Sequence, residues 1–402
     1  MPFNVEKIFE NVTKKSIFLN KSVLQSDYTP ETIPHREQQI KQVAKILACS
    51  LRLEKPSNLF IYGKTGTGKT LVVKYVLNEL NKKAAALKIP LKTIYVNCKL
   101  KKVSDTEYRI LAELISQLGA DIPATGLPTD VVYKKFINII DENKQLIIIV
   151  LDEIDEAVKK IGDAFLYNFT RLNSEMMNTQ ISFIGISNDL TFIDSLDPRV
   201  RSSLSEEELV FPPYNALQLK DILIERAKRS FKRSCVSSGV IEKIAALAAK
   251  EHGDARRAID LLRIAAELAE REGKSKLTLE FVDKAIEKIE RDKIVDLVET
   301  QPRHHQLILL SILNFFDTLK NKEQKVYTGD IYNRYYDLCK QLKLEPLTQR
   351  RVSDIVAELD MLGLINAQVI SKGRYGRTRE IKMTLPNSLI LKIKSIIEQQ
   401  IY

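Results

Sequence analysis

The segment GKTGTGKT, residues 63–70, constrains this chain more than any other feature of its sequence. It follows the apolar run Leu59–Tyr62 and precedes apolar residues at helical spacing, so a strand leads through a glycine-rich turn into a helix. In that context the pattern G-x-x-x-x-G-K-[ST] is typical of a phosphate-binding loop. Its glycines let backbone N–H groups turn toward a phosphate, and the helix N-terminus adds a favourable dipole. The sequence therefore predicts a nucleotide site in an α/β fold.

Two side chains of this loop have distinct predicted roles. Lys69 is expected to neutralise the β- and γ-phosphates, and the Thr70 hydroxyl is expected to hold Mg²⁺. The predicted cofactors are therefore ATP or ADP together with Mg²⁺. The residues of this segment expected to contact the nucleotide are Gly63, Lys64, Thr65, Gly66, Thr67, Gly68, Lys69, Thr70 and Leu71.

A second apolar strand ends in a pair of acids. Residues 147–151 read IIIVL and are followed by Asp152 and Glu153. The carboxyl ends of parallel strands meet at the sheet edge where open α/β folds bind their ligands. We expect Asp152 to hold Mg²⁺ through water and Glu153 to act as a general base on the attacking water. A further strand, 181–187, brings Asn188 to the same edge, where it can fix water or the γ-phosphate.

The hydrophobic pattern divides the chain into three predicted domains. Strands expected at 58–62, 92–97, 146–151 and 181–187 alternate with helices, which indicates a parallel, doubly wound sheet. The chain then reads as helical from Asn215 to about Thr300, and Pro302 marks a boundary. The predicted domains are a nucleotide-binding domain at 1–211, a helical domain at 212–300 and a smaller domain at 301–402.

These motifs resemble, in their order, those of the AAA+ superfamily and, within it, the archaeal origin-recognition and cell-division-cycle initiator family. The resemblance covers nearly the whole chain. It implies an AAA+ P-loop NTPase with a helical lid and a C-terminal winged helix. The matching segments are Pro34–Glu37 for the N-terminal box near the adenine, Asn188 for sensor 1, Leu196–Ser202 for the arginine-finger box, Phe211–Tyr214 for the entry to the lid, and Gly253–Arg256 for sensor 2.

The resemblance assigns nucleotide contacts to the lid. Tyr214 and Arg226 are expected to touch the nucleotide. Arg256 opens a predicted helix at 256–270, so its guanidinium can reach a γ-phosphate with two donors.

The arginine finger stays open between two residues. Arg199 and Arg201 both lie in the matching box, and either is implied to stabilise phosphate charge in a neighbouring subunit. Related eukaryotic sequences carry a further arginine where this chain has Ser203, so the box does not choose between the two.

The connection at 98–145 is longer than a minimal crossover between parallel strands requires. Residues 105–118 have helical spacing, and 121–129 contain proline and glycine. The segment resembles an insertion that in this family can touch DNA. A lysine run precedes it, which we interpret as solvated surface charge in preference to a DNA contact. These lysines are Lys99, Lys101 and Lys102.

Three helices and a hairpin are predicted in the last domain, the order of a winged helix. The helices are expected at 303–319, 328–342 and 348–362, with Thr328 and Thr348 as N-caps and Gly363 as a stop; the strands are expected at 364–371 and 378–385.

The predicted DNA contacts of this domain fall into two groups. The first turns of the third helix carry side chains that can hydrogen-bond base edges or phosphates. The hairpin tip, 372–382, carries five basic residues and one acid. The residues predicted to contact DNA are Gln349, Arg350, Arg351, Lys372, Arg374, Tyr375 and Arg377.

Charge and composition support a nucleic-acid partner. The chain has a formal net charge of +10, and residues 301–402 contribute sixteen basic and ten acidic residues. No apolar run reaches the roughly 18–20 residues of a membrane span, so we expect no membrane partner and a cytoplasmic, nucleoid-associated protein. The four cysteines form no CxxC pair, which argues against structural zinc and for reduced thiols.

The predicted function is that of a replication initiator. ATP-loaded protein is expected to bind double-stranded origin DNA beside paralogous or identical subunits and to help recruit the replicative helicase, with slow ATP hydrolysis as a reset. One alternative is a hexameric DNA motor of the branch-migration type, which also joins an AAA+ core to a winged helix. Another is a signalling ATPase whose winged helix binds only protein.

Overall fold

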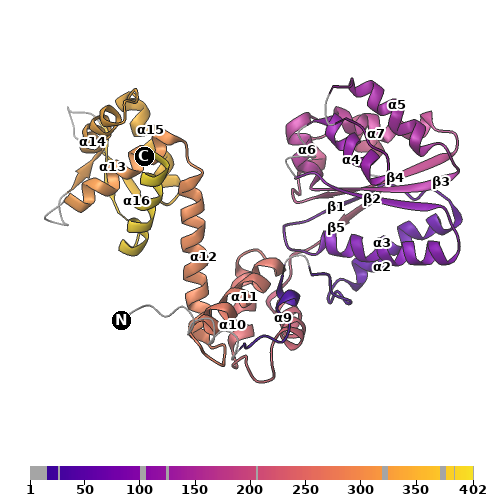
Figure 1. The fold of residues 1–402 in the computed structure, drawn as a ribbon, viewed down its shortest axis with the longest axis horizontal. Coiled ribbons are helices and arrows are strands. Elements are labelled where there is room, and N and C mark those ends of the chain that lie inside the picture. Colours follow the sequence, from indigo (N-terminus) through magenta and orange to yellow (C-terminus); the bar gives the residue numbers. More distant parts are fainter. Residues whose placement is uncertain are drawn as a thin grey trace. The chain divides into compact units, whose positions relative to one another are not determined.

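A computed structural model of the chain describes residues 16–25, 28–99, 106–123, 126–204, 207–318, 325–371, 377–383 and 385–401 (Figure 1). The chain forms two compact units, Met1–Asp283 and Lys284–Tyr402. The division falls within the long helix α12, Leu279–Glu299. The domain boundaries at 211 and 300 remain predictions. None of the helices in the described ranges is long and apolar enough to cross a membrane.

The first unit is built on a five-stranded sheet in which all neighbouring strands are parallel, in the order β2-β3-β4-β1-β5. This confirms the predicted doubly wound fold and its four predicted strands. The sequence did not predict β5, because its residues alternate poorly and begin with two glutamates. The strands are β1 Leu59–Tyr62, β2 Leu91–Asn97, β3 Gln145–Asp152, β4 Thr179–Ser187 and β5 Glu207–Val210.

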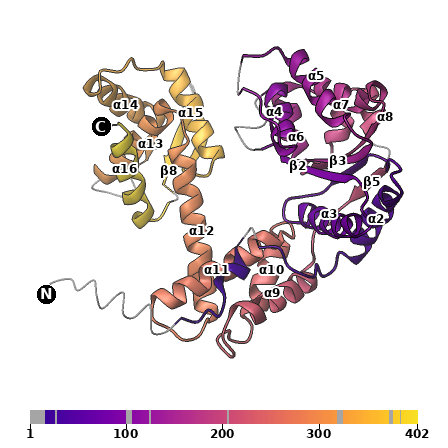
Figure 2. The ribbon, with the colours of Figure 1, turned by 45° about the vertical axis from the view of Figure 1, so that its right-hand side comes forward.

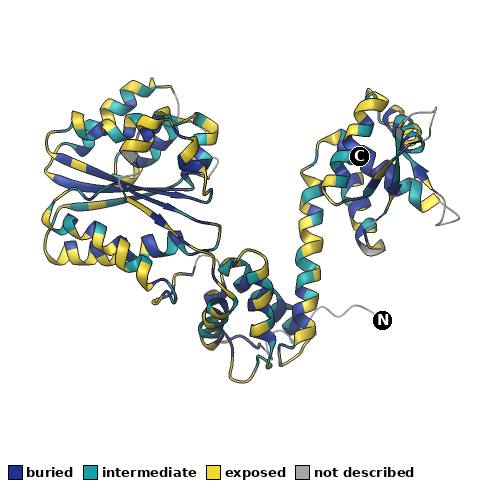
Figure 3. Cartoon of the chain, turned by 180° about the vertical axis from the view of Figure 1, so that it is seen from behind, coloured by how far each residue is buried: buried dark blue, intermediate teal, exposed yellow. Residues whose placement is uncertain are grey.

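Helices cover both faces of this sheet (Figure 1). One face packs against α4, α5, α6 and α7 in a core centred on Phe136, Phe169 and Phe183. The opposite face packs against α2 and α3. Figure 3 shows the strands largely in the dark blue of buried residues. The elements around the sheet are α2 Glu37–Leu47, η2 Ala48–Arg52, α3 Lys69–Ala86, α4 Glu107–Gln117, α5 Thr129–Ile140, α6 Ile154–Ile161, α7 Ala164–Glu175, η3 Phe192–Ser195 and α8 Pro198–Leu204.

The long crossover between β2 and β3 contains both α4 and α5. The predicted helix at 105–118 is confirmed, with Thr106 as its N-cap. Of the lysine run, Lys101 and Lys102 lie outside the described residues. Lys99 is described and is 69% exposed.

The lid consists of α9 Ala216–Ser230, α10 Val240–Lys250 and α11 Ala255–Arg271. Asn215 starts α9 with a capping box, and the Asp254 carboxylate starts α11 by accepting from two backbone N–H groups. An N-terminal segment, residues 16–25, lies across the lid and includes η1 Lys21–Leu24. It is held there by stacking of Phe18 on Phe231, whose ring centroids are 5.2 Å apart.

The second unit has the predicted winged-helix order. Its helices surround one core together with the end of α12 (Figure 2). Its three strands are antiparallel and lie in the order β6-β8-β7. The elements are α13 Arg303–Thr318, β6 Val326–Tyr327, α14 Thr328–Gln341, α15 Gln349–Met361, β7 Asn366–Ser371, β8 Arg377–Lys382 and α16 Asn387–Ile401.

The predicted helix boundaries here meet different outcomes. Thr348 caps α15 by accepting from Arg351 N–H, and Gly363 follows that helix at φ 73°, so both predictions are confirmed. Thr328 is not an N-cap: Tyr327 holds that position, and Asp330 accepts from the Tyr327 N–H. The sequence also missed α16, because it follows the hairpin and no part of the winged-helix pattern requires it.

Candidate nucleotide site and DNA-binding surface

The phosphate-binding loop turns from β1 into α3 with Gly66 at φ 69° and Gly68 at φ 91°. These left-handed values are open to glycine and costly for other residues. A Cβ on Gly66 would lie 1.7 Å from Asp254 Oδ1, so the lid packs directly against the loop at this point. Glycine is therefore required there by backbone conformation and by space.

Lys69 is buried, at 5% exposure, and its Nζ donates within the loop to the carbonyl oxygens of Gly63 and Lys64 at 2.6 and 2.9 Å. A third bond, of 2.9 Å, joins Nζ to Asn188 Oδ1 at the end of β4. Burial lowers the pKa of Lys69 to about 8, against the stabilising charge of Asp152. A phosphate would therefore meet an ammonium group that is already fixed in place.

The predicted magnesium-binding side chains are brought together. Thr70 Oγ1 donates to Asp152 Oδ2 at 2.7 Å. The Tyr95 hydroxyl donates to the same oxygen from β2, where Asn97 pairs in register with Asp152. Desolvation, followed by the nearby Asp152 carboxylate, raises the pKa of Tyr95, so the phenol stays a donor.

Glu153 occupies an unusual backbone position directly after β3. It is the N-cap of α6 at φ 56° and ψ 44°, the left-handed region that non-glycine residues rarely adopt. Its carboxylate lies 3.4 Å from Lys99 Nζ and is 17% exposed. Such backbone strain is commonly retained at functional sites.

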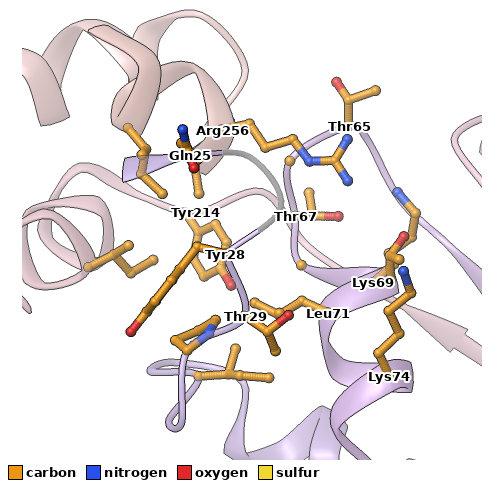
Figure 4. Close-up of a pocket in the computed structure, with 18 of the residues that line it drawn as sticks. Gln25, Tyr28, Thr29, Thr65, Thr67, Lys69, Leu71, Lys74, Tyr214 and Arg256 are labelled. Atoms are coloured by element: carbon orange, nitrogen blue, oxygen red, sulfur yellow. The ribbon is translucent and has the colours of Figure 1, made fainter. Parts of the chain in front are cut away.

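These side chains surround one cavity of about 400 Å³ (Figure 4). Its walls come from the loop, the ends of β2 and β3, the lid, and the N-terminal segment with the residues that follow it. The predicted site residues that line it are Thr65, Gly66, Thr67, Gly68, Lys69, Thr70, Leu71, Asp152, Glu153, Asn188, Tyr214, Arg226 and Arg256. Gly63 and Lys64 contribute through the carbonyls that hold Lys69.

The lid supplies three of these residues. In Figure 4 the Arg256 side chain extends from the start of α11 toward the loop at Thr65. Tyr214 is 4% exposed. Arg226 donates to the Val23 carbonyl at 3.0 Å and lies over the Tyr28 ring, so it also ties the lid to the N-terminal region.

The two candidate arginine fingers lie elsewhere on the unit. Arg199 is exposed on α8, and Arg201 NH1 pairs with Asp194 Oδ1 at 3.1 Å. Neither lines the cavity. Their position is compatible with action on a neighbouring subunit, and the choice between them stays a prediction.

Sequence reasoning missed several cavity residues. The cavity is also lined by Tyr95, Lys74, Tyr28, Thr29, Pro30, Thr32 and Ile33. Tyr95 could have been predicted from the sequence, because it is a polar residue near the carboxyl end of β2, the strand that pairs with β3 and Asp152. The N-terminal residues could not have been predicted, since their contribution depends on packing against the lid.

The candidate DNA-binding residues of the second unit divide by position. Gln349, Arg350 and Arg351 are exposed on the first turn of α15. Arg351 NH1 pairs with Glu358 Oε1 at 3.2 Å two turns further on. The hairpin-tip residues Lys372, Arg374 and Tyr375 lie outside the described residues, and Arg377 begins β8.

Comparison with family models accounts for most of the chain. The AAA domain matches residues 52–192, the Cdc6 AAA+ ATPase-type lid domain matches 220–287, and the CDC6 C-terminal winged helix domain matches 296–393.

Relatives of known name match nearly the whole length of this chain. An ORC1-type DNA replication protein of Thermococcus onnurineus is 52% identical over 98% of this chain and 94% of its own length. Its counterpart in Pyrococcus horikoshii is 51% identical over 95% and 91%. The structure of the Aeropyrum pernix ORC1 protein in complex with DNA has a TM-score of 0.78 and 44% identity, covering 94% of this chain and 97% of that one. This chain belongs to the family of ORC1-type DNA replication proteins.

Proposed function

We propose that this protein is an ATP-dependent replication initiator that binds double-stranded origin DNA. The observation that carries the proposal is the 52% identity, over nearly the full length of both chains, to a protein named as an ORC1-type DNA replication protein. The related Aeropyrum pernix protein, at 44% identity, has been solved in complex with DNA. Both names favour an initiator over a hexameric motor or a signalling ATPase.

The proposed ATPase chemistry uses the residues around the cavity. Lys69 neutralises phosphate charge, and Arg256 reaches the γ-phosphate from the lid. Asn188 fixes the attacking water or the γ-phosphate, and Glu153 accepts a proton from that water. Thr70 and Asp152 offer hydroxyl and carboxylate oxygens, which suit Mg²⁺. When bound, Mg²⁺ neutralises charge on the β- and γ-phosphates.

Hydrolysis is proposed to be slow and regulatory. A finger from Arg199 or Arg201 acts on a neighbouring subunit, so a lone chain has an incomplete site, and such fingers are worth about 10³–10⁵ in rate. We propose that paralogous or identical subunits meet on origin DNA in the cytoplasm, at the nucleoid, and help to recruit the replicative helicase.

The test is footprinting on origin regions of the source genome, compared with random duplex, in the presence of ATP or ADP. We expect protection confined to defined origin segments. Equal protection of random duplex would contradict origin recognition. ATP turnover that rises many-fold with long random duplex, in a stable hexamer, would support the motor instead.

A further inference from the structure

Arg36 is a buried cation whose donors are directed to backbone carbonyl groups. It stands at the N-cap of α2 and is 2% exposed. Its Nε donates to the Thr67 carbonyl at 2.9 Å, NH1 to the His35 carbonyl at 3.1 Å, and NH2 to the Pro212 carbonyl at 2.6 Å. A desolvated guanidinium is retained only where such contacts satisfy it.

The bond to Thr67 fixes a peptide group inside the phosphate-binding loop. In a planar trans peptide the C=O and the following N–H point in opposite directions. Arg36 does not line the cavity, whereas Thr67 and Gly68 do. With the Thr67 carbonyl held toward Arg36, the Gly68 N–H is directed to the other side, where a phosphate would accept it.

The same guanidinium also contacts the segment Phe211–Tyr214, which leads into the lid. It lies over the Tyr214 ring, with its central carbon 3.8 Å from the ring centroid. A Cβ on Gly68 would lie 2.9 Å from the Tyr214 hydroxyl and 3.8 Å from Arg36 Nε. The loop therefore packs directly against Arg36 and Tyr214, and Arg36 is in turn bonded to Pro212.

We propose that Arg36 is a positioning residue for the phosphate-binding loop, which orients the Gly68 amide toward the β-phosphate of the nucleotide. The proposal rests on the proposed function, since it assumes that this cavity binds ATP and ADP. It assigns Arg36 a part in selecting nucleotides by phosphate number, although Arg36 itself does not line the cavity.

A purely structural Arg36 would have a different signature. If Arg36 only joined the segment Phe211–Tyr214 to the nucleotide-binding domain, its loss would weaken the binding of every adenine nucleotide to the same extent. All of these nucleotides share the adenine and the ribose. A loop-orienting role affects ADP and ATP, whose β-phosphate meets the loop, far more than AMP. The ratio of the AMP and ADP dissociation constants therefore separates the two roles.

The experiment measures ATP, ADP and AMP binding by titration calorimetry for wild type, Arg36→Met and Arg36→Lys in the full chain. Arg36→Met is expected to weaken ATP and ADP about ten- to hundredfold and AMP less than about threefold, as for a lost hydrogen bond to a charged group. Arg36→Lys keeps the charge and can reach one carbonyl, so its loss is intermediate. Arg52→Met is the control, because the Arg52 side chain is 69% exposed and pairs with Glu54, two residues along the chain.

Circular dichroism melts establish whether each variant is folded. If Arg36→Met does not fold, the comparison of ADP with AMP is made with Arg36→Lys. Equal losses for ADP and AMP in the folded variant, or an unchanged ADP affinity, would overturn the positioning role. Absence of ATP and ADP binding by the wild type would instead reject the proposed function, so the two failures are distinguishable.

Discussion

The nucleotide cavity and the first turn of α15 hold their functional candidates in opposite ways. Lys69 and Asp152 are almost completely buried, and each has several hydrogen-bond partners within the protein. Gln349 and Arg350 are exposed to solvent. We infer that the proposed phosphate chemistry depends on fixed geometry, whereas the proposed contact with DNA depends on side chains that can adjust.

The largest expected effect is on chemistry at the fixed site. Glu153→Gln should retain ATP binding and lower the hydrolysis rate by about 10²–10⁴, because the general base is lost while the shape of the side chain is kept. Single-turnover hydrolysis and nucleotide titration measure the two quantities. Glu156→Gln is the matched control on the same helix, where Glu156 pairs with Lys159. Normal turnover by Glu153→Gln would remove Glu153 from the mechanism.

The next effect tests how far the hydrogen bond from Tyr95 to Asp152 contributes to Mg²⁺ binding. Tyr95→Phe removes the donor to Asp152 and should raise the Mg²⁺ concentration needed for tight ATP binding by about 10–100-fold. Binding measured without Mg²⁺ should hardly change. Tyr62→Phe is the control, since its hydroxyl donates to Glu208 away from the cavity. An unchanged Mg²⁺ requirement would show that Asp152 is held sufficiently by Thr70 and the Glu153 N–H.

A smaller effect, on DNA affinity, is expected for the exposed first turn of α15. Arg350→Ala should narrow the difference in affinity between origin and random duplex by about 1 kcal/mol or more. Arg351→Ala should do less, because Arg351 must first leave Glu358. Titration of labelled duplexes gives both values, with Lys392→Ala on α16 as the control for one lost charge. A larger effect of Arg351→Ala would mean that its ion pair positions the side chain for DNA.

The hairpin should contribute affinity without sequence discrimination. Arg374→Ala combined with Arg377→Ala should weaken origin and random duplex alike, because phosphate contacts carry little sequence information. The slope of log affinity against log salt should fall by about two. Titrations at two or more salt concentrations measure it. An unchanged slope would exclude these residues from the DNA interface.

The smallest effect concerns proton binding at Lys69. Its pKa of about 8 in the folded protein lies below the usual 10.5, so between these values the unfolded chain holds more protons and the contribution of Lys69 to stability rises with pH. Nucleotide binding needs the charged form and should take up a proton near pH 8. Affinity should fall about threefold from pH 7.5 to 8.5, and Lys69→Arg should abolish this dependence. Calorimetry in two buffers of different ionisation enthalpy detects the uptake.

The sequence predicted best where function and local pattern coincide. The loop, the acids after β3 and Asn188 were placed correctly because each follows an apolar strand, and parallel strands end at one edge. The segment Pro34–Glu37 was recognised as the box near the adenine, but the bond from Arg36 to the loop was not predicted, because it joins residues far apart in the chain. Tyr95 was overlooked although it lies near the end of a predicted strand. Strand β5 was missed because Glu207 and Glu208 obscure its pattern. Helix α16 has a clear apolar pattern and was missed because the winged-helix pattern ends with the hairpin that precedes it.

The path of the N-terminal segment limits how the lid can move. The chain first packs on the lid through Phe18, passes the cavity at Tyr28 and enters the base at α2; later it returns to the lid through Pro212. The lid is thus joined to the base twice, covalently through the segment at Pro212 and noncovalently through the packing of residues 16–25 on the lid. Any movement of the lid away from the base must therefore either break this packing or carry the N-terminal segment along with the lid.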